Sequence, residues 1–563
     1  MCKHLIMTDT RAIGQRAIGS AIVLCVACLA YFHALDQILF SSAGFSRIFH
    51  FLLAPDMKTA RVTLAISMLA ALWKWPAPVL RFVDYIGARA RRVAALSVAA
   101  FALGAITIYH NYPLSMDEYA AVFQAKVFAA GRLSAPLPVS YVDWLVVRGF
   151  NGEFLLASRE TGAAIEKYWP GFALLLTPFE LTRAPWLCNA LLSGLALLLI
   201  HWITREITRD ARAAGWAVLF ALGSGAFVAN AISYYSMQAH LTLNLLFVAL
   251  LLRPSRRRAF GAGLVGSLAL TLHNPVPHML FALPWLIAMG VDRKQWRYLP
   301  PMILGYLPGL GVGLGWLVLR SGIISGSHDL SSVHGITDGV FTWPDAAVLN
   351  IRVACFAKMW VWAVPGLFVF AVLGLLRQRE VLAPRLLAAS AILTLAGFFF
   401  VTFDQGHGWG YRYFHSAWGV IPILAACAMA DRSEANLPLV SFAGAVAMLN
   451  LLVVIPLQMS QIEGFISQQL AQLGAPERPG NNLYFIHPRG GFYVADMVQI
   501  DPLLRDPDLI MVSRGAALDS EMTLENWPGA VKIASVPAYD QWYLGPVDVR
   551  HAGSLIPPSA AGR

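Results

Sequence analysis

The chain has 563 residues, of which 57% are hydrophobic and only 13% are charged, and its formal net charge is +10. Soluble domains carry roughly 25% charged residues, so this composition excludes an ordinary soluble protein. The positive charge lies mainly in short segments between apolar runs, which indicates membrane topology and not nucleic-acid binding. The sequence therefore predicts a polytopic α-helical membrane protein.

Apolar segments that span or nearly span a bilayer recur from the N-terminus to about residue 457, and we expect about thirteen transmembrane helices. They lie near residues 18–35, 61–80, 93–110, 185–203, 215–231, 238–252, 260–273, 277–290, 299–319, 355–376, 385–402, 414–430 and 437–457. Residues 1–92 are expected to hold an additional N-terminal pair, before a catalytic transmembrane domain at residues 93–457. The apolar stretch 170–182 is too short to span and predicts a re-entrant or interfacial helix.

Basic and uncharged loops alternate along the chain. Clusters such as Arg89–Arg92 and Arg256–Arg258 alternate with loops at 232–239, 273–278 and 403–411 that contain no Lys or Arg. Basic loops stay in the cytoplasm, so the alternation predicts an inner-membrane protein with a cytoplasmic N-terminus and a periplasmic or extracellular C-terminus.

The C-terminal residues 458–563 differ from the rest of the chain. They contain turn pairs such as Gly490-Gly491 and short β-rich pieces at 482–486, 509–512 and 531–536. All six cysteines precede this region, so a disulfide scaffold is excluded. The pattern predicts a small extracytoplasmic α/β domain that caps the outer face.

An acidic pair, Asp117 and Glu118, directly follows the third apolar segment and lies in the predicted external loop 111–169. Carboxylates beside a span are costly to desolvate and usually mark a functional site. Partial burial would raise the pKa of such a group and let it take a proton from an attacking hydroxyl. We expect Asp117 to be a catalytic base and Glu118 to support it or bind metal. The alternative is that the pair caps a juxtamembrane helix at 118–130.

Other polar residues lie in loops on the same predicted side. Lys167 and Arg412 are candidates to bind a lipid-linked phosphate, although each could instead extend to lipid headgroups. The remaining candidate substrate-binding residues are Tyr168, Trp169, Tyr235, Gln238, His240, His273, His278, His407 and Tyr411. Glu118 and His240 are candidate ligands for a divalent metal ion, and hydrogen-bonded loop histidines are the alternative. No cofactor is otherwise indicated.

Four segments in this order resemble the GT-C glycosyltransferases, in particular the bacterial relatives of protein O-mannosyltransferases and the lipid A aminoarabinose transferase. They are Asp117-Glu118, residues 168–176, residues 185–192 and Gly410–Tyr413, within a resemblance that covers about residues 93–430. The resemblance implies a polyprenyl-phosphate-linked sugar donor, an external active site and inverting transfer to a hydroxyl of a lipid, glycan or protein. It also implies that Asp117 is the catalytic centre.

Two features depart from that group: the additional N-terminal pair, and a tail without an obvious module for a protein substrate. A transporter or flippase for a lipid or sugar would also suit many spans, but such folds often place ionisable residues at the midplane. A receptor or assembly factor, with the tail as its binding domain, is the third hypothesis.

Overall fold

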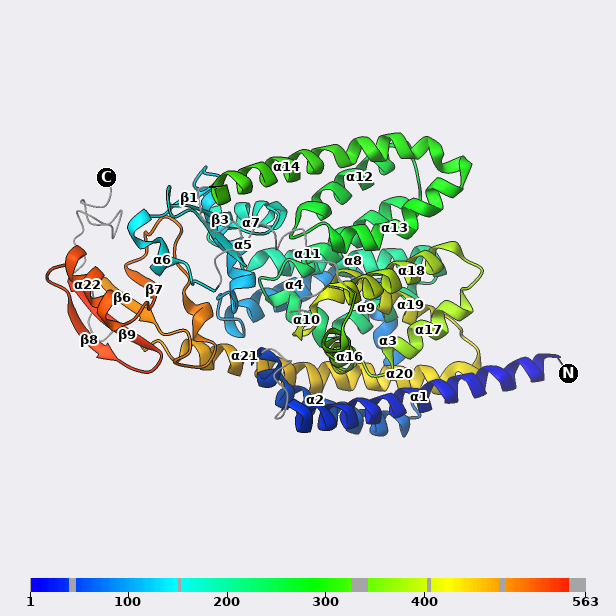
Figure 1. The fold of residues 1–563 in the computed structure, drawn as a ribbon. Coiled ribbons are helices and arrows are strands. Elements are labelled where there is room, and N and C mark those ends of the chain that lie inside the picture. The colour runs from blue at the N-terminus through cyan, green and yellow to red at the C-terminus, as the bar shows by residue number, and fades with distance from the viewer. Residues whose placement is uncertain are drawn as a thin grey trace.

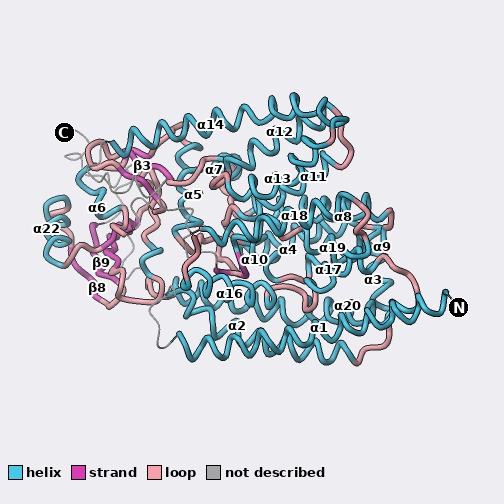
Figure 2. Tube along the Cα trace, turned by 45° about the vertical axis from the view of Figure 1, so that its right-hand side comes forward, coloured by secondary structure: helices cyan, strands magenta, loops and turns pink. Residues whose placement is uncertain are grey.

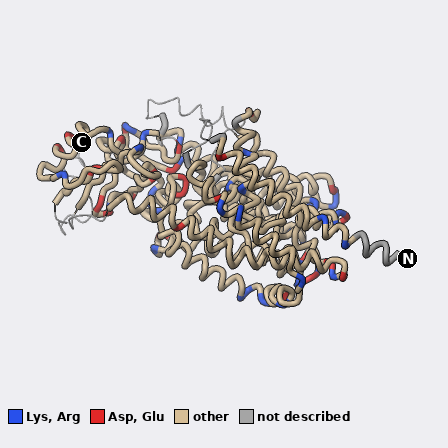
Figure 3. Tube along the Cα trace, turned by 90° about the horizontal axis from the view of Figure 1, so that it is seen from below, with Lys and Arg blue, Asp and Glu red and all other residues tan. Residues whose placement is uncertain are grey.

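The computed structural model describes residues 2–39, 47–149, 153–325, 343–401, 407–474 and 481–545. Its helices form one elongated body. The three-stranded and four-stranded sheets lie at the end of this body away from the N-terminus, whereas a two-stranded sheet at residues 407–411 lies among the helices (Figure 1 and Figure 2). Lys and Arg residues are prominent in the loops at the opposite end, near the N-terminus (Figure 3). The predicted combination of a polytopic helical part and a small C-terminal sheet domain is confirmed.

The N-terminal part forms four helices: α1 (Cys2–Leu39), α2 (Arg47–Ala71), α3 (Pro76–Ala88) and α4 (Ala90–Thr107). α2 and α3 meet at an angle of 112°. Pro76 begins α3, where its fixed φ suits a helical first turn and its missing N–H is not needed. The single span expected near residues 61–80 is therefore wrong, because this segment crosses a helix break.

A buried ion pair attaches the N-terminal helices to the body. Lys358 of α16 (Ala346–Val361) pairs with Asp56 of α2, and the Trp362 Nε1–H donates to the same carboxylate at 2.8 Å. Asp56 and Lys358 are almost fully buried. Moving α2 away from α16 would leave a buried charge without its partner, so the pair holds the two helices in register.

The segment between α4 and α8 carries short helices and a small antiparallel sheet of order β1-β3-β2. Its elements are α5 (Met116–Ala129), β1 (Ala135–Pro136), η1 (Val139–Tyr141), α6 (Val142–Leu145), β2 (Leu155–Ala157), β3 (Ala163–Glu166) and α7 (Gly171–Leu181). Helices were expected at 118–130 and 170–182, and α5 and α7 confirm both.

The helical body continues to residue 470. Its elements are α8 (Leu187–Thr208), α9 (Ala211–Leu222), α10 (Gly225–Ile232), α11 (Met237–Leu251), α12 (Arg256–Thr271), α13 (Val276–Val291), η2 (Arg293–Tyr298), α14 (Leu299–Ser325), α16, α17 (Leu367–Arg377), α18 (Leu382–Gly397), η3 (Phe398–Phe400), β4 (His407–Gly408), β5 (Gly410–Tyr411), η4 (Arg412–Ala417), α19 (Val420–Met429), η5 (Glu434–Asn436), α20 (Leu437–Leu449), the π-helical turn η6 (Asn450–Val454) and α21 (Ile455–Leu470). Because α21 is continuous, the predicted domain boundary at residue 458 falls inside a helix.

Glycines let α12 and α14 pack at backbone contact. A Cβ on Gly263 would lie 2.1 Å from the Met302 carbonyl oxygen, and one on Gly305 would lie 2.4 Å from that of Phe260. Small residues at such interfaces are the usual means of close helix packing in membranes. This contact brings the C-terminal part of α14, with Trp316, beside the segment between α4 and α7, where the Trp316 Nε1–H donates to the Tyr168 carbonyl at 2.7 Å.

The predicted number of spans is not confirmed. Within the described ranges, six helices are long and apolar enough to cross a membrane, or eight if each of two bent pairs counts as one span. Five further apolar helices have only 10–17 residues. One of them is α17, which the expected span 355–376 joined to α16. In the structure α16 ends at Val361 and α17 begins at Leu367. Gly366, directly before α17, has a φ of +82°, which is not helical.

The C-terminal domain is a four-stranded sheet of order β7-β6-β9-β8. Its elements are β6 (Asn481–Ile486), η7 (Val494–Met497), β7 (Asp508–Val512), α22 (Ala516–Asn526), β8 (Val531–Ser535) and β9 (Tyr539–Gly545), which confirms the three β-rich pieces expected here. β6 and β7 are parallel, so the chain between them must cross over, and this crossover carries η7. One apolar core joins the domain to α5; it includes Met116, Tyr119, Phe123, Leu483, Phe485 and Trp542.

Candidate active site

Asp117 lies in the first turn of α5 and faces two residues from distant parts of the chain. Arg412, the first residue of η4, donates from Nη1 to Asp117 Oδ2 at 2.6 Å, and the Tyr168 hydroxyl donates to Oδ1 at 2.5 Å. The Asp117 and Arg412 side chains are only 11% and 8% exposed. The structure therefore unites three predicted site residues in one charge-assisted cluster.

The guanidinium of Arg412 is also packed on an aromatic ring. Its Cζ lies 4.3 Å from the centre of the Tyr235 ring, whose hydroxyl is 3.2 Å from Ser115 Oγ. Arg stacks on aromatic faces in this way more readily than Lys, and the attraction increases when water is excluded. Tyr235 thus supports the cation, and Ser115, directly before α5, connects it to the start of the helix.

Asp117 is ionised at neutral pH. Burial by itself would raise the pKa of this carboxyl, but the positive charge of Arg412, the nearby His273 and the Tyr168 hydrogen bond together hold the pKa below its ordinary value. The carboxylate can therefore accept a proton. While it is paired with Arg412, however, it is a weak base.

Tyr168 connects Asp117 to a second group of charged residues. Its ring lies against His273, with centroids 3.7 Å apart, and the next residue, Trp169, donates its backbone N–H to the His273 carbonyl at 3.0 Å. Lys167, on the other side of Tyr168 in sequence, is close enough to Arg320 and Glu153 for electrostatic interaction. Burial first, and then Arg320, lowers the pKa of Lys167.

Lys167 lies in a group of charges next to the Asp117–Arg412 pair, and His273 is within electrostatic reach of both Lys167 and Arg412. No hydrogen bond or ion pair within the described part of the chain joins Lys167 to Asp117. Arg320, on α14, is a cation that the sequence analysis did not single out, and it is 5% exposed. A signal was present, because a single arginine near the end of an apolar helix is costly unless it faces a polar site.

Glu118 points away from Asp117 and is fully buried. It accepts hydrogen bonds from the Tyr109 hydroxyl and from the backbone N–H groups of Leu114 and Tyr234, each at 2.9 Å. Burial raises the pKa of Glu118 to about 7, against the effect of these donors. The side chain ties the end of α4 to the loop before α11, which is the supporting role expected for it.

The other predicted residues make contacts outside this cluster. His278 sits between Asn244 Oδ1 at 2.7 Å and the Tyr306 hydroxyl at 2.8 Å, and Gln238 Oε1 lies 3.0 Å from His415 Nε2. Within the described chain, both ring nitrogens of His240 and the Tyr411 hydroxyl are buried without a hydrogen-bond partner.

Trp169 and His407 complete the predicted set. The Trp169 ring contacts α14 so closely that a Cβ on Gly313 would lie 2.0 Å from it. The side chain of His407 lies outside the described residues. Substrate-binding roles for this whole set stay predictions.

The predicted metal ligands are not part of a metal cluster in this structure. No group of three or more His, Cys, Asp or Glu side chains in the described ranges is arranged to hold a metal ion. Glu118 already accepts three hydrogen bonds, and its donors leave little room for a cation. A metal role for Glu118 and His240 gains no support from this geometry.

The C-terminal domain reaches the same cluster. Asp496 of η7 accepts a hydrogen bond from the Met116 backbone N–H at 2.7 Å, directly beside Asp117. Tyr493, with φ of +55°, lies within electrostatic reach of Asp117, Arg412 and Tyr235. Neither residue could be singled out from the sequence, because their proximity to Asp117 depends on the crossover between β6 and β7.

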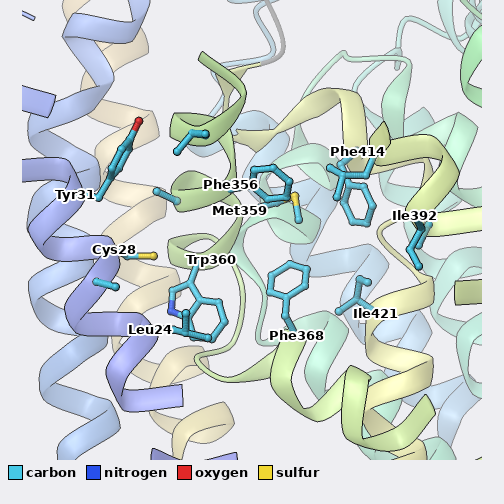
Figure 4. Close-up of a pocket in the computed structure, with 15 residues that line it drawn as sticks. Leu24, Cys28, Tyr31, Phe356, Met359, Trp360, Phe368, Ile392, Phe414 and Ile421 are labelled. Carbon is cyan, nitrogen blue, oxygen red and sulfur yellow. The ribbon is translucent and has the colours of Figure 1, made fainter. Parts of the chain in front are cut away.

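An apolar cavity of about 490 Å³ opens between α1, α16, α17 and α18 (Figure 4). Figure 4 shows Leu24, Phe356, Trp360, Phe368 and Phe414 around it. Phe414 lies in η4, two residues after Arg412. Leu24 and Phe356 are 39% and 38% exposed, so the cavity opens at the side of the helical body.

In comparisons with known proteins, no protein-family model and no curated protein matches this chain. Solved structures do match. The crystal structure of ArnT from Cupriavidus metallidurans bound to undecaprenyl phosphate aligns with 14% identity and a TM-score of 0.51, over 80% of this chain and 97% of that chain. The apo structure of the same protein aligns with 13% identity and a TM-score of 0.48, over 80% and 98%. The chain therefore shares the fold of ArnT, and the resemblance to the GT-C group is confirmed as a likeness of fold.

Proposed function

We propose that this protein is an integral membrane glycosyltransferase that moves a sugar from a polyprenyl-phosphate donor to an acceptor hydroxyl on the outer face of the cytoplasmic membrane. The observation that carries the proposal is the largely buried Asp117–Arg412 pair at the start of α5, 2.6 Å between charged atoms. A base and a phosphate-binding cation are the two groups that this reaction needs. The undecaprenyl phosphate bound to ArnT, a protein of the same fold, supports the donor class.

The reaction needs one proton transfer and one displacement. Asp117 takes the proton of the acceptor hydroxyl while the oxygen attacks the anomeric carbon. The bond from that carbon to the phosphate oxygen breaks, and the polyprenyl phosphate leaves with the electron pair. A single displacement inverts the anomeric centre.

Donor binding would make Asp117 a better base. In the free protein Arg412 lowers the pKa of the Asp117 carboxyl. A donor phosphate offers Arg412 another anionic partner, so Asp117 loses part of this stabilisation and its pKa rises toward the ordinary range. Lys167 and Arg320, on the other side of Tyr168, supply further positive charge for the leaving phosphate.

The cavity beside η4 suits the apolar chain of the carrier. Its lining is almost entirely apolar, it opens at the side of the helical body, and Phe414 connects its wall to Arg412. A chain in this cavity would have its phosphate end near the Asp117–Arg412 pair. Ala27, an exposed residue of the lining, gives a test: Ala27→Trp should fill the cavity, raising the KM for long-chain donors without affecting short-chain donors.

The decisive experiment uses lipids from cells. Polyprenyl-phosphate sugars extracted from a strain that lacks this protein are incubated with the purified protein and with membranes of the same strain. Transfer of label to an envelope lipid, glycan or protein, present with the wild type and absent with Asp117→Asn, supports the proposal. Identical glycans and lipid-linked sugars in the deletion strain and wild type, together with no transfer in vitro, would overturn it.

A further inference from the structure

Helix α5 begins without a cap of its own. Ser115 is the residue before its first turn, but its side chain makes no capping hydrogen bond and instead contacts the Tyr235 hydroxyl. The N–H groups of a first helical turn need an external acceptor, and a missing cap typically destabilises the helix. Met116, the first residue of α5, finds this acceptor 380 residues away: its N–H donates to Asp496 Oδ1 at 2.7 Å.

Neighbouring residues of the crossover hold both sides of Asp117. Before it, Gln499 Nε2 donates to the Pro113 carbonyl at 2.6 Å. After it, the Ile500 backbone N–H donates to the Tyr119 hydroxyl at 2.8 Å, and this hydroxyl in turn donates to the Ile500 carbonyl. Asp496 lies between these contacts and is only 7% exposed. The C-terminal domain thus fixes the backbone from residue 113 to residue 119.

We propose that Asp496 is a positioning residue for the transfer reaction: by capping α5 from the C-terminal domain, it holds Asp117 in register with Arg412. The inference rests on the proposed function of Asp117. It adds that the C-terminal domain is a working part of the active site. A shift of about 1 Å in a reacting group can reduce a rate by about 100-fold, so a loosened first turn is expected to affect turnover more than donor binding.

Asp496 also gives the cap a pH dependence. Burial, and then the charge of Asp117, raises the pKa of Asp496 to about 7. Tyr112, Tyr493 and Asp117 are the titratable groups that face it. As the pH rises through 7, Asp496 becomes an anion and its hydrogen bond from Met116 becomes charge-assisted and stronger. An asparagine at this position keeps an acceptor oxygen but cannot undergo this change.

The test compares three variants of the full-length protein. Asp496→Ala removes the acceptor, Asp496→Asn keeps it without the charge, and Asp501→Asn is the control. Asp501 is an equally buried acid of the same domain, but it accepts hydrogen bonds only from Leu503 and Arg505 within that domain. Steady-state transfer from the extracted polyprenyl-phosphate sugars gives kcat and KM between pH 6 and 8, and hydrogen exchange reports on the backbone amides of residues 114–119.

We expect Asp496→Ala to lower kcat by about 10- to 100-fold with KM nearly unchanged, and to speed exchange at Met116. Asp496→Asn should retain most of kcat near pH 6 and fall behind the wild type as the pH approaches 8, and Asp501→Asn should match the wild type. A wild-type kcat and wild-type exchange in Asp496→Ala would overturn the inference, as would an equal loss in Asp501→Asn.

Two further outcomes are distinguishable. If Asp496→Ala does not accumulate, Asp496→Asn decides: a kcat more than about 10-fold below wild type at pH 6, at normal accumulation, would overturn the inference because the acceptor oxygen is still present. If the wild type transfers no sugar, the proposed function fails, and unchanged exchange at Met116 in Asp496→Asn and Asp496→Ala would separately refute the capping role.

Discussion

Replacing Asp117 with asparagine separates proton transfer from folding. The amide is nearly isosteric, so one of the two hydrogen bonds, from Tyr168 or Arg412, can persist. The negative charge that balances a guanidinium only 8% exposed is lost. Removing one partner of a buried ion pair costs about 3–5 kcal/mol, and the Tyr235 ring under Arg412 retains part of the stabilisation of this cation. We therefore expect a stability loss near 3 kcal/mol, at the lower end of that range.

The loss of activity should be much larger than this instability can explain. Removing a general base typically lowers a rate by about 10²- to 10⁴-fold, equivalent to about 3–5 kcal/mol in the barrier. A protein that remains folded at the assay temperature shows this loss in full. Binding of undecaprenyl phosphate should persist and become tighter, because Arg412 no longer has an anionic partner within the protein.

The assay measures initial transfer rates, thermal unfolding and undecaprenyl phosphate binding on the same preparations. Asp143→Asn is the control, because Asp143 lies in the same segment between α4 and α8 and forms only partly exposed ion pairs, with Arg159 at 2.8 Å and Arg514 at 3.6 Å. Such pairs contribute about 1 kcal/mol or less, so the control should leave all three measurements unchanged. Near-wild-type transfer by Asp117→Asn would refute the assignment of Asp117 as base. The transporter hypothesis would then be favoured.

The pH dependence of this stability loss has a definite sign. The folded-state pKa of Asp117 is lowered, so its contribution to stability is present above the ordinary carboxyl pKa of about 4 and is lost as the pH falls through the lowered value. The difference in melting temperature between the wild type and Asp117→Asn should therefore be constant from pH 5 to 6, and it should shrink toward pH 8, where the wild type alone carries the repulsion between Asp117 and ionised Asp496. A difference that disappears near pH 6 would show that Asp117 is protonated in the resting protein.

Further predictions follow from the neighbouring charges and from the topology. Arg412→Lys should recover only part of the donor affinity lost in Arg412→Ala, because an ammonium cannot reproduce the planar stack on an aromatic ring, and full recovery would contradict a specific guanidinium contact. Lys167→Ala should raise the KM for the donor and leave acceptor preference unchanged, as measured with mixed acceptors. The pKa of Glu118 is raised to about 7, so the wild type loses stability as the pH rises toward 7. Glu118→Gln lacks this loss, so its melting temperature minus that of the wild type should be larger at pH 8 than at pH 5. A cysteine placed at Asn481 should react with an impermeant thiol reagent in cells without outer barriers, and one at Arg256 should not. The opposite labelling would place the proposed site in the cytoplasm.

The residue types of the site could be predicted because ionised side chains are costly to desolvate near a membrane. An aspartate directly after an apolar segment and an arginine directly before one need a polar partner, and each satisfies the other here. The sequence could not pair them, since 295 residues separate them and nothing in either segment encodes which spans are neighbours. The sequence also could not place Lys167 relative to Arg412; in the structure His273 lies within electrostatic reach of both, and their shared phosphate-binding role stays a prediction.

The predicted number of spans is not confirmed for a different physical reason. Hydropathy reports the apolar character of a segment but not the direction of its axis, and five apolar helices of the described chain are shorter than a full crossing. Pro76 and Gly366 mark two of the breaks. Both residues were visible in the sequence, but membrane helices tolerate such residues where neighbouring elements satisfy the freed backbone groups. Only the packing decides whether such a residue ends a helix.

Asp496 shows why a site can depend on a residue that no local pattern reveals. Asp496 is one of several aspartates of a small domain, and nothing in its largely apolar segment indicates where its side chain lies. Its importance arises because β6 and β7 are parallel, which forces the intervening chain to cross over at the end of the sheet that faces α5. The shared apolar core then fixes the domain on this helix, and Asp496 of the crossover accepts the hydrogen bond of the Met116 N–H, which the Ser115 side chain does not cap. The proposed catalytic geometry thus depends on the strand order of the C-terminal domain, although this domain contributes no proposed proton acceptor. Loss of the Asp496 contact should therefore slow the reaction by loosening the register of Asp117 with Arg412, while the apolar cavity and the fold are retained.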